Sequence, residues 1–143
     1  MGEDGSPGSA AALRWAFQDA ARRGVAVHVV RAWSLANSAS LTAAAQGLPF
    51  GTVPSFEQCE ATVLTALQAE VSAAQKDAAT PDVPVHLHVV HGPAAHALLA
   101  AAREADVLVV GERGIGGFLG LLLGSTAEQV LRHARCTVAV VRS

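Results

Sequence analysis

The chain has 143 residues, of which 51% are hydrophobic and 15% charged, and its formal net charge is −2 at pH 7. This length suits one domain with a genuine core, so we expect a single domain over residues 1–143, and the composition excludes an intrinsically disordered chain. The charged residues are scattered, which excludes nucleic-acid binding through a basic patch but not a nucleotide held by backbone N–H groups.

The sequence also bears on the cellular compartment. No run reaches the roughly 18 apolar residues of a membrane span, and no secretory signal opens the chain. Cys59 and Cys136 are the only cysteines and form no Cys-x-x-Cys motif, so we expect reduced, buried thiols. These features predict a cytoplasmic protein that does not bind membranes.

The first predicted element is a helix that follows an Asp-Gly-Ser turn at residues 4–6. Ser6 is a favourable N-cap, Pro7 suits the first helical position, and Gly24 suits the left-handed residue that ends a helix. Residues 25–33 then form a β-branched run, which is typical of a buried strand.

A second helix and strand follow. Residues 34–54 contain much Ala, Ser, Gly and Pro, and we expect a long, mobile connection at the rim of the binding site. A capping box of Ser55 and Gln58 opens a helix that extends to about Ala78. Residues 85–91 alternate apolar side chains with histidines, which predicts a strand.

The histidines of that strand resemble a metal site only superficially. His86 and His88 share one strand face, and His91 and His96 are close in sequence. A closed structural zinc site needs four ligands, and no cysteine or acid is placed to complete one. We therefore expect solvated histidines near a sheet edge and no metal.

The last part of the chain repeats the alternation of strands and helices. A helix follows Gly92-Pro93, and residues 107–110 form a wholly apolar run typical of a buried parallel strand. A capping box of Ser125 and Glu128 predicts another helix, and residues 137–141 form the final strand. This order predicts an α/β fold, an open parallel sheet with helices on both faces.

A glycine-rich loop joins the strand at 107–110 to the helix that follows. Gly111, Gly114 and Gly124 remove side chains that would block close approach to a ligand. A glycine loop that ends at a helix N-terminus is typical of a phosphate site, because free N–H groups and the helix dipole favour anions. The hydroxyls of Ser125 and Thr126 would add hydrogen bonds. A lid that only packs, without binding phosphate, is the alternative.

The spacing Gly111-x2-Gly114-x9-Gly124-Ser125 matches the nucleotide signature of the universal stress protein family, and the chain resembles that family from residue 4 to residue 143. The resemblance implies an adenine nucleotide alpha hydrolase-like fold that binds ATP, alone or with Mg²⁺ or Mn²⁺. It implies nucleotide contacts at Asp4, Val29, Val110, Gly111, Gly114, Gly124, Ser125 and Thr126. The backbone of Val29 would contact the adenine. Asp4 would face the adenosine portion, with an Asx-turn as the alternative role.

The chain departs from the family at its start. In the family an interior strand precedes the first helix, whereas only Met1-Gly2-Glu3 precede Asp4 here. The resemblance therefore implies a truncated first strand, from a shortened start or from one half of a longer tandem protein. It also implies a homodimer that pairs through the edge strand at residues 137–141.

The resemblance implies a nucleotide-responsive regulatory protein of the stress response. A Walker A motif and a nucleophile elbow are both missing, and Glu112 is the only acid in the glycine loop. We therefore do not expect a fast enzyme. Two alternatives stay open, a dimeric interaction module with a vacant pocket and a slow ATPase.

Overall fold

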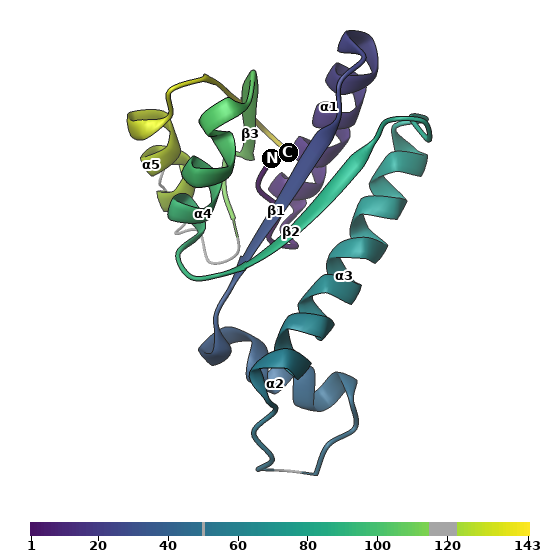
Figure 1. Cartoon of the computed structure of the whole chain (residues 1–143), viewed down its shortest axis with the longest axis vertical. Coiled ribbons are helices and arrows are strands. Elements are labelled where there is room, and N and C mark those ends of the chain that lie inside the picture. Colours follow the sequence, from purple (N-terminus) through teal and green to yellow (C-terminus); the bar gives the residue numbers. More distant parts are fainter. Residues whose placement is uncertain (50, 115–122) are drawn as a thin grey trace.

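A computed structural model describes residues 1–49, 51–114 and 123–143 of the chain. Its elements are α1 (Pro7–Arg23), β1 (Val27–Trp33), α2 (Leu35–Ala45), α3 (Phe56–Asp77), β2 (Val85–His91), α4 (Ala94–Ala101), a 3-10 turn (Ala102–Glu104), β3 (Val107–Gly111), α5 (Ser125–His133) and β4 (Thr137–Val141) (Figure 1). The alternation of strands and helices confirms the predicted α/β class. No helix of the described part is long and apolar enough to cross a membrane.

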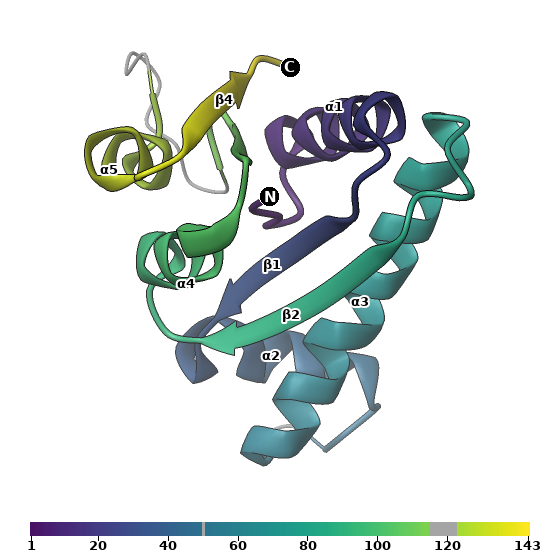
Figure 2. The same cartoon turned by 45° about the horizontal axis from the view of Figure 1, so that its top comes forward.

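The sheet consists of two parallel strand pairs that the N-terminal residues join. β1 pairs with β2, and β3 pairs with β4. Between them, the Val30 N–H donates to the Met1 carbonyl at 2.9 Å, and the Glu3 N–H donates to the Val30 carbonyl at 3.0 Å. On the other side, the Gly2 N–H donates to the Val109 carbonyl at 3.0 Å. Residues 1–3 thus occupy the row between β1 and β3 (Figure 2), the place predicted for a shortened first strand.

Helices cover both faces of this sheet. On one face, Phe17 of α1 and Leu67 of α3 are fully buried against Val29 of β1. On the other face, Leu98 of α4 packs with Val30 of β1 in a second apolar cluster that includes α5. Val29 and Val30 belong to different clusters because successive side chains of a strand point to opposite faces.

The predicted helix boundaries hold at α1 and α3. Ser6 caps α1 by accepting a hydrogen bond from the Ser9 N–H at 3.1 Å, and Gly24 ends it with a φ of 68°. Ser55 and Gln58 form the predicted capping box at the start of α3.

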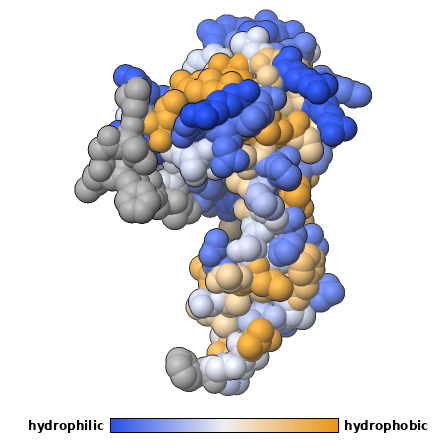
Figure 3. All heavy atoms as spheres, turned by 90° about the vertical axis from the view of Figure 1, so that its left-hand side faces the viewer, coloured by the Kyte–Doolittle hydropathy of each residue, from blue (hydrophilic) through white to orange (hydrophobic). Residues whose placement is uncertain are grey.

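The expectation of an irregular connection over residues 34–54 was wrong, because α2 lies within it. The segment is rich in alanine, a strong helix former, and Thr42 packs its side chain at 0% exposure. α2 and the N-terminal half of α3 project from the rest of the molecule (Figure 1). Leu41 of α2 and Val53, in the connection between the two helices, are exposed. Figure 3 shows apolar surface along this projection.

Candidate functional site

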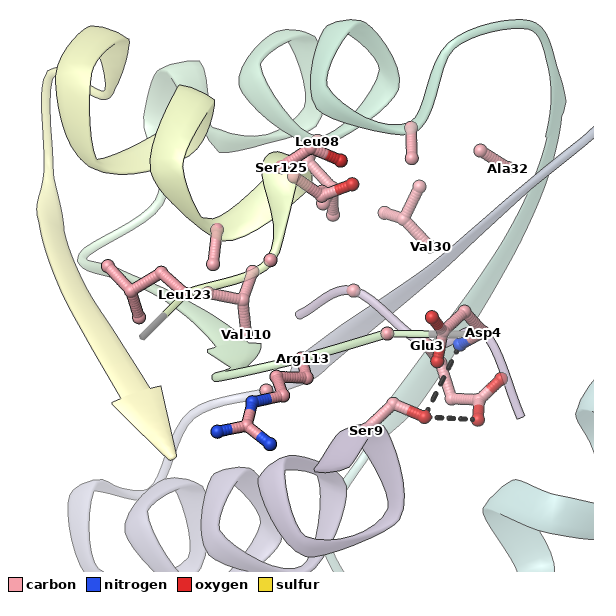
Figure 4. Close-up of a pocket in the computed structure, with 17 residues that line it drawn as sticks. Glu3, Asp4, Ser9, Val30, Ala32, Leu98, Val110, Arg113, Leu123 and Ser125 are labelled. Carbon is pink, nitrogen blue, oxygen red and sulfur yellow. Dashed lines mark hydrogen bonds between the residues drawn. The ribbon is translucent and has the colours of Figure 1, made fainter. Parts of the chain in front are cut away.

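A cavity of about 390 Å³ opens at the carboxyl-terminal ends of β1 and β3. This edge of a parallel sheet is where ligands of open α/β folds bind. The cavity is lined by Gly2, Glu3, Asp4, Ser9, Val30, Ala32, Ala94, Leu98, Val110, Gly111, Arg113, Gly114, Leu123, Gly124, Ser125, Thr126 and Ala127. In Figure 4, Glu3, Asp4 and Ser9 gather on one side, and Ser125 and Leu98 lie across from them.

All but one of the predicted site residues line this cavity. The exception is Val29, whose side chain is 0% exposed in the core formed by α1 and α3. Its neighbours Val30 and Ala32 line the cavity instead. The predicted contact was with the backbone of Val29, so the pairing of β1, and not the burial of this side chain, decides which backbone groups face the cavity.

The backbone of β1 follows the same alternation. The Val27 N–H and the Trp33 carbonyl bond towards β2, to Pro84 and Gly92, whereas Val30 bonds towards the N-terminal residues. Ala32 is two positions beyond Val30, so its N–H and C=O point to the same side as those of Val30. Because residues 1–3 end their pairing at Val30, the backbone of Ala32 faces the cavity.

The N-terminus of α5 forms the opposite wall. The predicted Ser125–Glu128 capping box is wrong, because Gly124 is the N-cap and Ser125 is the first helical residue. The Glu128 N–H donates to the Gly124 carbonyl at 2.9 Å, which starts the helix one residue earlier than the sequence pattern indicates. The hydroxyl of Ser125 is therefore not the helix cap, and it lies at the cavity.

The N–H groups at this helix end are not all available to a ligand. The Gly124 N–H donates to the Glu112 carbonyl at 2.7 Å, so this N–H is already engaged in the structure. The N–H groups of Ser125, Thr126 and Ala127 belong to the first turn, where a helix offers no acceptor of its own. Ala127, which was not among the predicted site residues, joins Ser125 and Thr126 as a donor at the cavity wall.

The three signature glycines are required for three different reasons. A Cβ on Gly111 would lie 2.6 Å from the backbone carbon of Gly8, so Gly111 allows α1 to pack on β3 rather than a ligand to approach. A Cβ on Gly114 would overlap the Asp4 carboxylate. Gly124 has a φ of −73°, and among the described residues a Cβ at this position would come no closer than 3.4 Å to an atom beyond its chain neighbours. Within the described part of the chain, neither backbone strain nor a steric clash therefore accounts for Gly124, which lines the cavity.

Asp4 forms the Asx-turn considered for it and also lies at the cavity. Its Oδ1 accepts a hydrogen bond from the Ser6 N–H at 3.0 Å, which is the Asx-turn. The residue is exposed and also lines the cavity, with its carboxylate next to Gly114. The turn therefore fixes the carboxylate at the cavity wall.

Glu3 is a buried acid that was not among the predicted site residues. Its residue exposure is 4%, and its carboxylate pairs with Arg31, which also pairs with Glu70 of α3. Burial lowers the pKa of the Arg31 guanidinium, and the nearby Glu70 carboxylate partly opposes that change in pKa. The sequence contains no local pattern for this network, because only the pairing of residues 1–3 with β1 brings Glu3 and Arg31 together.

Histidines gather elsewhere on the sheet. His28 Nδ1 lies 2.9 Å from His88 Nε2, and the His28 ring stacks on His86 with centroids 4.7 Å apart. Within residues 1–49, 51–114 and 123–143, no group of three or more His, Cys, Asp or Glu side chains is arranged to hold a metal ion.

Taken with the parallel sheet, these walls define an α/β protein with a ligand cavity at the carboxyl edge of its sheet, between a helix N-terminus and an Asx-turn. Residues 1–142 match the model of the universal stress protein family, and the chain belongs to that family.

Curated relatives extend over nearly the whole chain. It is 37% identical over 142 residues to a universal stress protein of Mycolicibacterium smegmatis, a match that covers 99% of this chain and 44% of that protein. It is 38% identical over 146 residues to a universal stress protein of Mycobacterium tuberculosis, with the same coverage of 99% and 44%. The chain thus spans less than half the length of these relatives.

Solved structures share the fold. A universal stress protein in complex with cAMP superposes with a TM-score of 0.66 at 26% identity, over 99% of this chain and 93% of that one. UspA from Lactobacillus plantarum gives a TM-score of 0.72 at 20% identity, over 99% and 94%. A universal stress protein from Arabidopsis thaliana with AMP bound gives 0.54 at 16%, over 98% and 83%.

Proposed function

We propose that this chain binds an adenine nucleotide, ATP included, in the 390 Å³ cavity and acts as a nucleotide-responsive regulatory domain rather than as a fast enzyme. The observation that carries this proposal is the N-terminus of α5 at the cavity, next to Gly124, for which neither strain nor a clash with the described residues accounts. Bound AMP and cAMP in structures of the same fold support the adenine assignment.

The phosphate groups would lie against α5. Phosphate oxygens would accept hydrogen bonds from the N–H groups of Ser125, Thr126 and Ala127 and from the hydroxyls of Ser125 and Thr126. The helix dipole favours the negative charge of the phosphate groups. Gly124 lines the cavity, and the lack of a side chain there would let a ligand oxygen approach its backbone closely. Arg113 is exposed at the cavity and would add positive charge.

The adenosine part would lie between β1 and α4. Val30 and Leu98 offer apolar surface to the base, and the backbone N–H and C=O of Ala32 suit the hydrogen-bonding edge of adenine. The Asp4 carboxylate would accept hydrogen bonds from ribose hydroxyls. These contacts would favour adenine over guanine, whose corresponding edge has the opposite donor and acceptor pattern.

We further propose that the domain works in the cytoplasm as a homodimer through β4. β4 pairs with β3 on one side, and no strand of the described part of the chain pairs with its other side, which therefore suits pairing with a second copy. Nucleotide binding and release would suffice for this role, without hydrolysis.

A thermal-shift titration of this chain with AMP, ATP and GTP, with and without Mg²⁺, tests the proposal. A ligand at a hundredfold excess over its Kd stabilises a fold by about 2.7 kcal/mol, so binding would be readily seen. We expect a shift with AMP and ATP and none with GTP. Gly124→Val should fold but lose the shift, whereas Gly124→Ala, whose Cβ the protein accommodates, should lose less. A cooperative melt that no adenine nucleotide shifts would refute nucleotide binding and favour an interaction module with a vacant pocket.

A further inference from the structure

We propose that Glu3 is a positioning residue of the nucleotide site. Its buried carboxylate, held by Arg31, fixes the Asp4–Ser6 turn and so determines where the Asp4 carboxylate meets the adenosine part of the ligand. This inference rests on the proposed function and assigns a task to a residue outside the family signature.

The two oxygens of the Glu3 carboxylate face different parts of the molecule. Oε1 accepts hydrogen bonds from the Gly5 N–H at 2.8 Å and from the Ser9 hydroxyl at 3.0 Å. Oε2 pairs with the guanidinium of Arg31. Oε1 therefore holds both the Asp4–Ser6 turn and the start of α1, whereas Oε2 is anchored to Arg31 within the sheet.

Ser9 extends this hold to Asp4. Its Oγ accepts a hydrogen bond from the Asp4 N–H at 3.4 Å (Figure 4). The same Oγ lies 2.9 Å from the Ser6 carbonyl oxygen, a second acceptor for its hydroxyl. The backbone on both sides of the Asp4 side chain is thus bonded to Glu3, directly at Gly5 and through Ser9 at Asp4.

Arg31 anchors the Glu3 carboxylate to the sheet. The side chain of Glu3 is 2% exposed and that of Arg31 is 11% exposed, while Glu70 on α3, the other partner of Arg31, is 40% exposed. Arg31 belongs to a strand that is paired on both sides, to β2 and to residues 1–3. The turn is therefore tied to the sheet and, beyond it, to α3.

Stability does not account for this arrangement. Replacing a buried ion pair by apolar residues of similar size is commonly neutral or stabilising, so an apolar pair could fill the same space. An apolar residue would, however, leave the Gly5 N–H and the Ser9 hydroxyl without their shared acceptor. The carboxylate is suited to holding the turn rather than to strengthening the core.

A matched pair of double variants separates these two roles. Glu3→Leu/Arg31→Met removes the ion pair and the acceptor, whereas Glu3→Gln/Arg31→Met removes the ion pair but keeps an amide oxygen for Gly5 and Ser9. Affinities for adenosine, AMP and pyrophosphate are measured by calorimetry at a temperature where every variant is fully folded. A purely structural role would change the melting temperature and leave these affinities equal.

We expect the leucine variant to bind adenosine and AMP about tenfold more weakly, by the same factor for both, as for loss of one well-placed hydrogen bond. Its affinity for pyrophosphate should not change, and the glutamine variant should bind all three like the wild type. In an Asp4→Ala background, the leucine exchange should have no further effect, because it acts through Asp4.

Equal adenosine affinity in the leucine and glutamine variants would overturn the positioning role, as would a parallel loss of pyrophosphate binding. Failure of the wild type to bind adenosine or AMP would instead overturn the proposed function, and the positioning role with it. The wild-type titration therefore tells the two failures apart.

Discussion

The Gly124 N–H donates a hydrogen bond to the carbonyl of Glu112 at 2.7 Å, which closes the glycine loop between β3 and α5. Glu112 is in turn tied to the final strand, because its own N–H donates to the Val141 carbonyl at 2.8 Å. The start of α5 is thereby held next to the end of the parallel sheet. This contact places the free N–H groups of the helix at the cavity.

Ser125 provides a direct test of the phosphate wall. Because Gly124 rather than Ser125 caps α5, Ser125→Ala should change the free energy of unfolding by less than about 0.5 kcal/mol. It should nevertheless weaken AMP binding several-fold, since a charge-assisted hydrogen bond is lost. Urea denaturation and calorimetry measure the two effects.

Ser55→Ala is the matched control for that substitution. Ser55 accepts a hydrogen bond from the Gln58 N–H at 3.2 Å as the N-cap of α3, so its loss should cost about 1 kcal/mol of stability. Ser55 does not line the cavity, and AMP affinity should stay unchanged. If Ser125→Ala behaved like Ser55→Ala, the Ser125 hydroxyl would be a structural group.

Gly111 should be required for folding rather than for ligand approach. A Cβ at this position would lie 2.6 Å from the Gly8 backbone carbon and 2.8 Å from the Gly8 carbonyl oxygen, so one of the two backbones must shift. We expect Gly111→Ala to lower the free energy of unfolding by about 1–3 kcal/mol, as overpacked sites do. Gly124→Ala is the control in the same denaturation series, and equal stability of the two variants would contradict this packing argument.

The sequence predicted what depends on local pattern. The caps at Ser6 and Ser55 follow from residue type and spacing, and the parallel α/β fold follows from alternating periodicity. The sequence was not sufficient where the outcome depends on a shift of a single residue. Val29 and Val30 are both apolar, so the sequence alone does not show which one faces the cavity.

The other omissions depend on long-range contacts. Glu3 and Arg31 are 28 residues apart, and only the pairing of residues 1–3 with β1 brings them together. A capping-box pattern at Ser125 could not show that the Glu112 carbonyl would hold Gly124 in place and start the helix one residue earlier. Tertiary contacts here override local preference.

The histidine cluster should make stability depend on pH. Burial, and then the neighbouring His86 and His88, lower the pKa of His28 below its ordinary value of 6.5, and the Met1 amine lowers that pKa further. Between the two pKa values the unfolded chain binds more protons than the folded one, so stability is fully present above about pH 6.5 and falls as the pH falls through the folded pKa. The midpoint of urea denaturation should therefore decrease between pH 7 and pH 5.

His28→Gln should flatten the dependence of stability on pH, because it removes the imidazole whose protonation the folded state disfavours. His96→Gln on α4 is the control for the loss of one exposed histidine outside the cluster. An unaltered pH profile in His28→Gln would assign the acid sensitivity to other groups.

A second cavity, of about 400 Å³, lies at the amino-terminal ends of β1 and β3, where residues 1–3 leave the row between the strands unfilled. Trp15 and Leu98 line it from the two helical layers, and Val27 lines it from β1. Burial lowers the pKa of the Met1 amine to about 6, and this amine donates to the His28 carbonyl at 2.6 Å. The cavity therefore has room for residues placed before Met1.

A variant with four valines placed before Met1 should therefore be more stable than the chain itself. The added residues would continue the parallel pairing with β1, replace the buried amine by an amide, and contribute on the order of 1.5 kcal/mol or more for each valine that is fully buried. A Gly-Ser extension of the same length is the control, because it has no apolar side chains to bury. We expect the valine extension alone to raise the denaturation midpoint and to remove the part of the pH dependence between pH 6 and 8 that the amine causes. Equal midpoints for both extensions would show that this cavity does not accept a strand.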